Sequence, residues 1–364
     1  MRILLLLGLI TACSGGGSGS DSRSASPSPP ELERLFNMGV TFSPRGNLAN
    51  SGEADFIDFF TGTAHGEIKA LHTPWRDDEA SAGSIPDSAL QFMQQQQDFG
   101  FVPVVGFGWT NGEGMPVDRF GNDFLSSASE PANNSWSNTE TRNEFKAMLS
   151  AFAGTYKPRY LFLGNETNAY FLSHSQTQWD DWVTMFAEAY DAIKAVSPET
   201  IVYTTFQLER MKGLGVKTGQ TYPEHFELLA DHLASGKIDA FAFTSYPYLE
   251  YDSPADIPLD YYSSLINRVG DKKIIYSELG WIATTVGLFQ GSEALQSEFV
   301  DRFFLLNEAV ESAALLEAMV WLFLYDFTDY SAFVAFTDIA LRSNSGDIIR
   351  LADERWRHFA QLSK

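Results

Sequence analysis

Short apolar segments alternate with segments of helical spacing along the chain from Glu31 onward. The apolar segments predict buried strands, because a strand covered on both faces reads as a nearly continuous hydrophobic run. There are eight of them, at residues 36–42, 68–71, 101–107, 160–163, 200–205, 238–243, 273–276 and 318–324. The segments between them predict helices at 87–99, 140–156, 178–196, 223–234, 259–269 and 293–312, with a closing helix at 348–362.

This regular alternation indicates an α/β fold, and the count favours a single (β/α)8 barrel, also called a TIM barrel, over residues 31–364. An open doubly wound sheet is the rival topology, and it would normally carry a Gly-rich phosphate-binding turn after an early strand. Gly106-Phe-Gly108 lacks the third Gly of that turn, and the segment at 213–218 lacks the Gly immediately before its Lys. We therefore expect the barrel.

The first 30 residues stand apart from the strand and helix pattern. Arg2 is followed by an apolar run at 3–10 that is too short to span a bilayer, and small residues precede Cys13. This pattern resembles the lipobox of a bacterial lipoprotein. The resemblance implies a signal peptide at 1–12, lipidation of Cys13 and a Gly/Ser/Pro linker at 13–30. It places the protein in the bacterial cell envelope, lipid-anchored to a membrane and facing the periplasm or the cell exterior. A signal peptide cut elsewhere, or a buried Cys, is the alternative interpretation.

Composition and charge narrow the classes of partner. Hydrophobic residues make up 44% of the chain and aromatic residues 14%, so a large core can form. The 47 acidic against 25 basic residues give a formal charge of -22, which repels a phosphate backbone and argues against nucleic acid as a partner. The single Cys and the six His show no His-x-His or His-Glu-x-x-His spacing, so we expect no metal site and no other cofactor.

Two Glu residues follow directly on predicted strands. Glu166 comes after the strand at 160–163, and Glu278 comes after the strand at 273–276. A buried strand runs into a carboxylate only where that group is paired or faces a polar cleft. Strand ends meet at one mouth of a barrel, and two carboxyl groups facing one another are what glycoside hydrolysis requires. Surface ion pairs for both residues are the alternative in so acidic a chain.

Asn-Glu after the fourth strand and Glu after the seventh, with an aromatic residue after the sixth and a Trp in the eighth, resemble clan A. Clan A is the 4/7 superfamily of retaining glycoside hydrolases, and the resemblance covers residues 36–364 through short motifs. It implies that Glu166 is the acid/base, that Asn165 binds the sugar 2-hydroxyl and that Glu278 is the nucleophile. A polysaccharide or oligosaccharide is the implied substrate. We expect Glu166 to begin protonated, its pKa raised by the nearby charge of Glu278.

Three aromatic residues match the clan less specifically. Tyr246 leaves the sixth strand where the clan has a Tyr that donates a hydrogen bond to the nucleophile, and Trp321 lies where it has a sugar-stacking Trp. Core packing is the alternative for both. Trp281 ends the segment Ser277-Glu-Leu-Gly280-Trp281, which has a weak likeness to endo-galactanases and endo-glucanases of the clan, and it is a further candidate for substrate binding.

The end of the second strand departs from the clan pattern. Many members have an Arg there near the nucleophile, whereas this strand ends Leu71-His72-Thr73-Pro74-Trp75-Arg76. Either His72 takes the polar role or Arg76 reaches back, and a purely structural His72 is the alternative. His174 and Gln207 are weaker candidates for the site.

A long polar stretch at 110–137 follows the third strand and has Trp109 and Trp136 at its ends. Long loops at the C-terminal face of a barrel usually build the substrate site. Because aromatic faces stack on pyranose rings, we expect Trp109 and Trp136 to line an open groove that accepts internal chain segments. Such a groove predicts endo cleavage.

Two classes of function are therefore weighed. The first is a surface-anchored retaining glycoside hydrolase. The second is a catalytically inactive carbohydrate-binding lipoprotein of a glycan-uptake system. The presence of both Glu residues together with Asn165 favours the enzyme, because a binding protein has no need to keep two carboxyl groups so close together.

Overall fold

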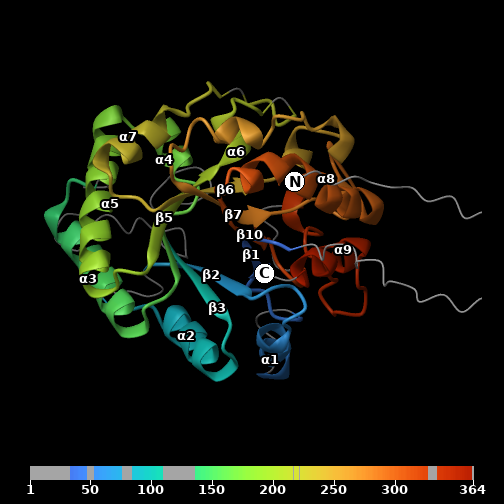
Figure 1. Ribbon diagram of the computed structural model, residues 1–364, viewed down its shortest axis with the longest axis horizontal. Coiled ribbons are helices and arrows are strands. Elements are labelled where there is room, and N and C mark those ends of the chain that lie inside the picture. The colour runs from blue at the N-terminus through green and yellow to red at the C-terminus, as the bar shows by residue number, and fades with distance from the viewer. Residues whose placement is uncertain are drawn as a thin grey trace, which may run out of the picture.

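The computed structural model describes residues 33–46, 53–75, 84–109, 136–215, 217–220, 222–326 and 334–362. In this part of the chain eight parallel strands close into a barrel, in the order β1-β10-β7-β6-β5-β4-β3-β2 (Figure 1). The strands are β1 (Asn37–Thr41), β2 (Ile68–Pro74), β3 (Val102–Gly108), β4 (Tyr160–Leu163), β5 (Ile201–Gln207), β6 (Ala240–Ser245), β7 (Lys273–Leu279) and β10 (Leu316–Trp321). The predicted (β/α)8 barrel is confirmed, with strand ends shifted by at most three residues.

Helices cover the outside of this barrel (Figure 1). Those that the sequence predicted are α2 (Asp87–Phe99), α3 (Thr139–Tyr156), α5 (Gln176–Val196), α7 (Glu227–Ser235), α8 (Glu293–Ser312) and α9 (Leu351–Ala360). Local sequence explains their ends: Ser175 and Gln178 form a capping box at the start of α5, and α2 ends at Gly100 in the left-handed conformation. Within the described residues, no helix combines the length and the hydropathy that crossing a membrane requires.

The predicted helix at 259–269 is wrong. This segment forms turns and the short 3-10 helix η4 (Ser263–Leu265). Tyr261 and Tyr262 both turn toward the core, where their hydroxyls contact Glu209 and Ser245. These contacts hold the segment in tighter turns.

Several short elements were not predicted. They are α1 (Glu53–Thr61), α4 (Asn168–Ser173), α6 (Leu208–Met211) and a hairpin formed by β8 (Thr284–Val286) and β9 (Phe289–Ser292). Of these, α4 and α6 follow closely on the ends of β4 and β5. They fix the direction in which the chain leaves those strands.

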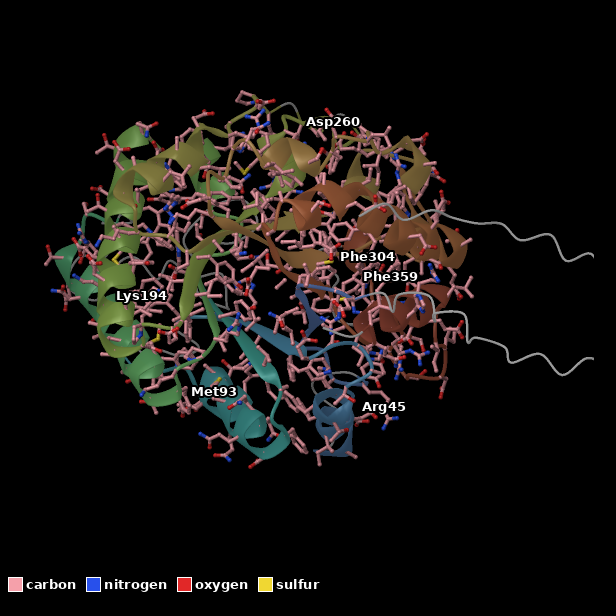
Figure 2. The ribbon with its side chains drawn as sticks, viewed as in Figure 1. Arg45, Met93, Lys194, Asp260, Phe304 and Phe359 are labelled. Atoms are coloured by element: carbon pink, nitrogen blue, oxygen red, sulfur yellow. The ribbon has the colours of Figure 1, made fainter. Side chains whose placement is uncertain are left out.

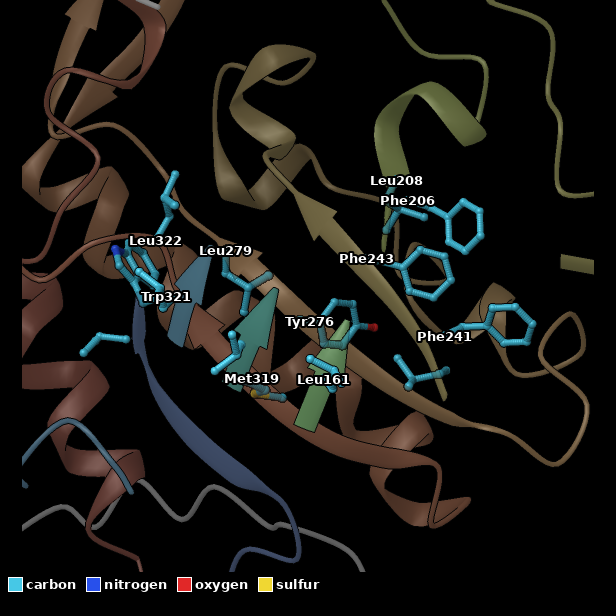
Figure 3. Packing of buried hydrophobic residues seen from close by; sticks show 14 of the residues in the cluster. Leu161, Phe206, Leu208, Phe241, Phe243, Tyr276, Leu279, Met319, Trp321 and Leu322 are labelled. Carbon is cyan, nitrogen blue, oxygen red and sulfur yellow. The ribbon is translucent and has the colours of Figure 1, made fainter. Parts of the chain in front are cut away.

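Strand side chains alternate between the barrel interior and an outer layer. The interior is filled by Ile68, Ala70, Val104, Tyr160, Phe162, Tyr203, Ala240, Ala242, Ile275, Ala318 and Val320. Gly106 leaves room for the Phe162 ring, because a Cβ there would lie 1.8 Å from Phe162 Cζ. The intervening residues point outward and pack against the helices, as Leu161, Phe243, Tyr276, Met319 and Trp321 do in Figure 3.

The C-terminal helix α9 packs against α8 and fixes the end of the barrel domain. Phe304 of α8 stacks on Phe359 of α9 with ring centroids 3.7 Å apart (Figure 2). The buried Asp353 bonds to His65 and accepts hydrogen bonds from Arg342 and Arg357. Although burial alone would raise the pKa of Asp353, the hydrogen bonds from His65 and Arg342 lower it to about 2. This ion-pair cluster ties α9 to the loop before β2.

Candidate active site

Glu166 and Glu278 both face the C-terminal mouth of the barrel. Glu166 lies in the turn between β4 and α4, and Glu278 lies in β7. Strict alternation from the outward-pointing Tyr276 would turn Glu278 outward as well. A register shift at Ser277 prevents this, because Phe243 pairs with Tyr276 whereas the next residue, Thr244, pairs with Glu278. Such a bulge re-aims the side chains that follow it, so Glu278 shares the inward face with Thr244.

The turn after β4 brings Asn165 and Glu166 to the mouth together. Gly164 and Glu166 have positive φ angles of 77° and 49°, a conformation that suits Gly and is rare for Glu. Thr205 of β5 holds this turn. The Glu166 N–H donates to Thr205 Oγ1 at 2.7 Å, and the Thr167 N–H donates to the Thr205 carbonyl at 2.9 Å.

Hydrogen bonds link the two carboxyl groups to their surroundings. The Tyr246 hydroxyl donates to Glu278 Oε2 at 2.5 Å, and Asn165 Nδ2 donates to Glu278 Oε1 at 3.4 Å. The Thr244 hydroxyl donates to Glu166 Oε1 at 2.6 Å. The donor to Glu278, Asn165, precedes Glu166 in the chain. The donor to Glu166, Thr244, pairs with Glu278 in the sheet. The two carboxyl groups are thus cross-linked, because each is bonded by a residue next to the other. The hydrogen bond expected between Tyr246 and Glu278 is present.

Both carboxyl groups have raised pKa values. Burial raises the pKa of Glu166, opposed by the charge of Arg210 and the hydrogen bond from Thr244. Burial and then repulsion by Glu166 raise the pKa of Glu278 to about 7, opposed by the hydrogen bonds from Tyr246 and Asn165. The expectation that the charge of Glu278 raises the pKa of Glu166 is therefore wrong: burial raises the pKa of Glu166, and the repulsion between the two groups raises the pKa of Glu278 instead. Burial also raises the pKa of Tyr246 well above its usual value, so its hydroxyl remains a donor.

A cleft of about 170 Å³ opens beside Glu166 at the ends of β5 and β6. Aromatic and polar side chains line it together, among them Gln207, Arg210, Gln220, Tyr222, Tyr246, Glu250 and Phe336. Glu166 and Tyr246 line the cleft, so a ligand in this space would contact the Glu166 carboxyl group and the tyrosine whose hydroxyl bonds to Glu278. A larger cavity of about 460 Å³ around Asp326 and Arg350 is lined by neither carboxyl group.

The predicted groove lined by Trp109 and Trp136 is wrong for these two side chains. Both are 0% exposed and pack edge to face with ring centroids 5.0 Å apart. Trp182 of α5 contacts both rings, so the three indoles form a core under the helices. Val104, Gly106 and Gly108 take the inward positions of β3, and Trp109 therefore follows on the outward side.

Trp281 and Trp321 are likewise not sugar-binding surfaces in this structure. Trp281 is 0% exposed and donates its indole N–H to the Gln290 carbonyl in the hairpin. Trp321 is 1% exposed, donates to the Ile339 carbonyl and packs against Phe299. Trp321 alternates with the inward Val320, so it points into the outer layer (Figure 3). Burial of both indole rings contradicts the two predicted substrate contacts.

His72 does face the barrel mouth. It lies on the same inward face of β2 as Ile68 and Ala70, and the centroid of its ring lies 5.5 Å from that of the Phe162 ring. Gly108 makes room for it, because a Cβ there would lie 2.4 Å from His72 Nε2. The ring is exposed at the mouth, and the protein atoms around it lower the pKa of His72 by partial desolvation. His72 is thus a neutral polar group at neutral pH.

Other predicted residues fall outside the mouth or outside the described residues. Gln207 lines the cleft, whereas His174 follows α4 and stacks on Tyr170 with ring centroids 4.0 Å apart. Arg76, Cys13 and the loop residues 110–135 lie outside the described residues.

Three residues of the site were missed by the sequence analysis. Thr205 and Thr244 are inward residues near the ends of β5 and β6, and Glu209 is a buried carboxyl group beside the cleft. Glu209 accepts hydrogen bonds from Gln207 Nε2 at 2.7 Å and from the Tyr261 hydroxyl at 2.9 Å. Burial raises the pKa of Glu209 to about 7, opposed by hydrogen bonds from the Tyr246 backbone and the Tyr261 hydroxyl. The two threonines could have been identified as polar residues at the C-terminal ends of strands, at positions that alternation places on the inward face.

No group of three His, Cys, Asp or Glu side chains in the described ranges is arranged to hold a metal ion.

Comparison with known proteins identifies the fold. No protein-family model and no curated relative matches the sequence. The exo-beta-1,4-mannosidase Op5Man5 from Opitutaceae bacterium strain TAV5 matches with a TM-score of 0.61 at 15% identity, over 91% of this chain and 61% of the mannosidase. This chain therefore spans about three fifths of that protein.

Two further solved structures match over most of this chain. A psychrophilic glycoside hydrolase family 10 endo-beta-1,4-xylanase gives a TM-score of 0.59 at 11% identity, over 89% of this chain and 97% of the xylanase. An uncultured Clostridium sp. beta-glucuronidase gives 0.57 at 13% identity, over 90% and 50%. These matches agree with the (β/α)8 barrel fold that the resemblance to clan A implied. The three names differ in the sugar, so the shared fold does not select a substrate.

Proposed function

We propose that the chain is a retaining glycoside hydrolase that cleaves β-glycosidic bonds in a polysaccharide or oligosaccharide. The observation that carries this is the environment of Glu278. Its carboxylate receives the Tyr246 hydroxyl and the Asn165 amide, while Glu166 lies across the same mouth beside an open cleft. A surface ion pair would not bury two carboxyl groups together without a cationic partner for each.

In this mechanism Glu278 attacks the anomeric carbon while Glu166 gives its proton to the departing glycosidic oxygen. The leaving sugar takes that proton, and a glycosyl ester on Glu278 remains. Glu166, now ionised, removes a proton from water, which attacks the same carbon and releases Glu278. Two displacements at one carbon retain its configuration.

The hydrogen bonds support placing the shared proton on Glu166. Two donors point at Glu278 and one points at Glu166, which favours the negative charge on Glu278. Repulsion by an ionised Glu166 acts in the opposite direction, because it raises the pKa of Glu278. We place the charge on Glu278 because a nucleophilic carboxyl group must be ionised to attack. Repulsion between the groups disfavours ionising both, and the pair titrates as a unit. The charge of Arg210 opposes protonation of Glu166 and becomes useful in the second step, when Glu166 must act as a base.

Endo cleavage remains part of the proposal. The tryptophans at the ends of 110–137 are buried and no longer support it. Its remaining support is the open cleft lined by Glu166, Arg210 and Tyr222. Early products of mixed length would agree with it, whereas monosaccharide as the sole early product would indicate exo cleavage.

Anchoring through Cys13 is a separate proposal. A single acyl chain binds membranes only marginally, and a processed bacterial lipoprotein carries several, so Cys13→Ala should move the protein from the membrane fraction to the soluble fraction. Palmitate labelling that persists in the variant would contradict the proposal.

The function is tested by measuring reducing-sugar release from a panel of plant and algal glycans. NMR spectroscopy then identifies the anomer of the first product. Release with retained configuration supports the mechanism. Binding without release from any glycan would favour the carbohydrate-binding alternative, and an inverted product would exclude Glu278 as the nucleophile.

A further inference from the structure

Thr205 lies where the two halves of the candidate site meet. It is fully buried in β5, and its side chain points inward toward the turn after β4. Its hydroxyl donates to Asn165 Oδ1 at 2.7 Å and accepts the Glu166 N–H at 2.7 Å. One side chain thus contacts both the residue that donates to Glu278 and the backbone of the opposing carboxyl residue.

The single hydroxyl hydrogen fixes the orientation of the Asn165 amide. A Thr hydroxyl has one hydrogen to donate, and here it is given to Asn165 Oδ1. The amide oxygen is therefore held on the Thr205 side, which turns Nδ2 toward Glu278 Oε1. A flipped amide would place two N–H groups against Thr205 and an oxygen against the carboxylate, so it is disfavoured on both sides.

The same residue holds the backbone of Glu166. Glu166 has a φ of 49°, which L residues rarely adopt and which persists only where surrounding contacts enforce it. Both flanking N–H groups bond to Thr205, that of Glu166 to Oγ1 and that of Thr167 to the carbonyl oxygen. The direction in which the Glu166 carboxyl group leaves the chain is set by these bonds.

We infer that Thr205 is a positioning residue that couples the two carboxyl groups, by orienting the Asn165 amide toward Glu278 and by holding the Glu166 turn. The expected effect of Thr205 on the reaction rate rests on the proposed function. The placement of Asn165 relative to Glu166 by the Thr205 hydroxyl does not.

Thr205→Val removes the hydroxyl and keeps the size and branching of the side chain. We expect kcat/KM to fall about 10- to 100-fold, because small misplacements of reacting groups are that costly. The loss should be in kcat, since Thr205 lies behind the residues that meet the sugar. The pKa of Glu278 should rise as the Asn165 bond weakens, which moves the acidic limb of the rate profile to higher pH.

Two matched variants separate positioning from packing. Thr205→Ser restores the hydroxyl and should remain within about threefold of the wild type, whereas a loss above about tenfold would overturn the inference. Thr204→Val makes the same change at the adjacent buried residue, which bonds Thr167 and Gly164 rather than Asn165 or Glu166. An equal loss in Thr204→Val would show that the strand merely tolerates no substitution.

An NMR readout keeps this test independent of the activity. In the full chain, ¹³C-labelled Glu reports the pKa of Glu278, and the side-chain ¹⁵N–H₂ signals of Asn165 report its immobilisation. A raised pKa and altered Asn165 signals in Thr205→Val, with both unchanged in Thr205→Ser and Thr204→Val, support the inference. Unchanged values in Thr205→Val overturn it. If the wild type cleaves no glycan, the proposed function fails while the titration still decides the role of Thr205.

Discussion

The two walls of the barrel mouth are built differently. On the wall of β4 to β7, the strand ends carry inward polar side chains joined by hydrogen bonds, namely those of Asn165, Glu166, Thr205, Thr244, Tyr246 and Glu278. On the wall of β10, β1, β2 and β3, the inward positions near the mouth hold small or apolar residues together with Thr41 and His72, while Trp109 and Trp321 point outward. Hydrogen-bonded polar side chains are concentrated on the first wall, and most side chains of the second wall pack in the core.

The difference shows that direction decides the role of a strand-end residue more than its type. Trp321 and Glu278 are both strand-end residues, but Trp321 follows the inward Val320 and turns away from the mouth. Glu278 would also turn away without the bulge at Ser277. One register shift therefore separates a side chain in the candidate site from a side chain in the helix layer.

The most damaging change to the polar wall should be Glu278→Gln. Without the carboxylate no glycosyl ester can form, and we expect a loss on the order of 10⁵-fold with every substrate, as for other covalent nucleophiles. Initial rates on glycan and on aryl glycosides measure this, with thermal unfolding as the control for folding. Hydrolysis at the wild-type rate would remove Glu278 from the mechanism.

Glu166→Ala should have the next largest effect, and it should depend on the leaving group. Loss of a general acid reduces the rate on the order of 10²–10⁴-fold where the departing oxygen needs a proton. Activated aryl glycosides depart with little protonation, so their glycosylation should change much less. Equal losses on the natural glycan and on a dinitrophenyl glycoside would contradict the acid role.

The difference between the two walls could be predicted from the sequence only in part. Apolar runs locate all eight barrel strands, and a Glu directly after a strand identifies Glu166 and Glu278, because a carboxylate at such a place needs a polar cleft. The bulge at Ser277 and the bonds made by Thr205 depend on the register between strands that are distant in sequence. Without that register, Trp109, Trp281 and Trp321 could be placed at strand ends but not on a face.

Tyr246→Phe should reduce the activity less than the loss of either carboxyl group, because it removes one hydrogen bond from the wall of β4 to β7. Loss of a hydrogen bond to a charged group corresponds to a rate loss of about 10- to 100-fold. The hydrogen bond from Tyr246 lowers the pKa of Glu278, so its removal raises that pKa. Because Glu278 must be ionised to attack, activity should then be lost at a higher pH than in the wild type. The acidic limb of the plot of kcat against pH should move to higher pH, which narrows the profile.

Tyr248→Phe is the matched control for that change. Tyr248 is equally buried, but its hydroxyl donates to the Ala335 carbonyl rather than to Glu278. Its pH profile should coincide with that of the wild type. A shift of the same size in both variants would mean that aromatic packing, rather than the hydroxyl of Tyr246, sets the titration of the pair.

The smallest effect on activity should come from Trp321→Phe on the packing wall. This change opens space beside Phe299 and leaves the Ile339 carbonyl without its indole donor, so the free energy of unfolding should fall by about 1–3 kcal/mol. KM should stay within about twofold, because Trp321 is 1% exposed and points away from the mouth.

Tyr222→Ala in the cleft should have the opposite effect, raising KM while leaving the free energy of unfolding nearly unchanged. Denaturant unfolding and steady-state kinetics on both variants test the division. A several-fold rise of KM in Trp321→Phe would show that this Trp reaches the sugar after all, and the two walls would then share the binding of substrate.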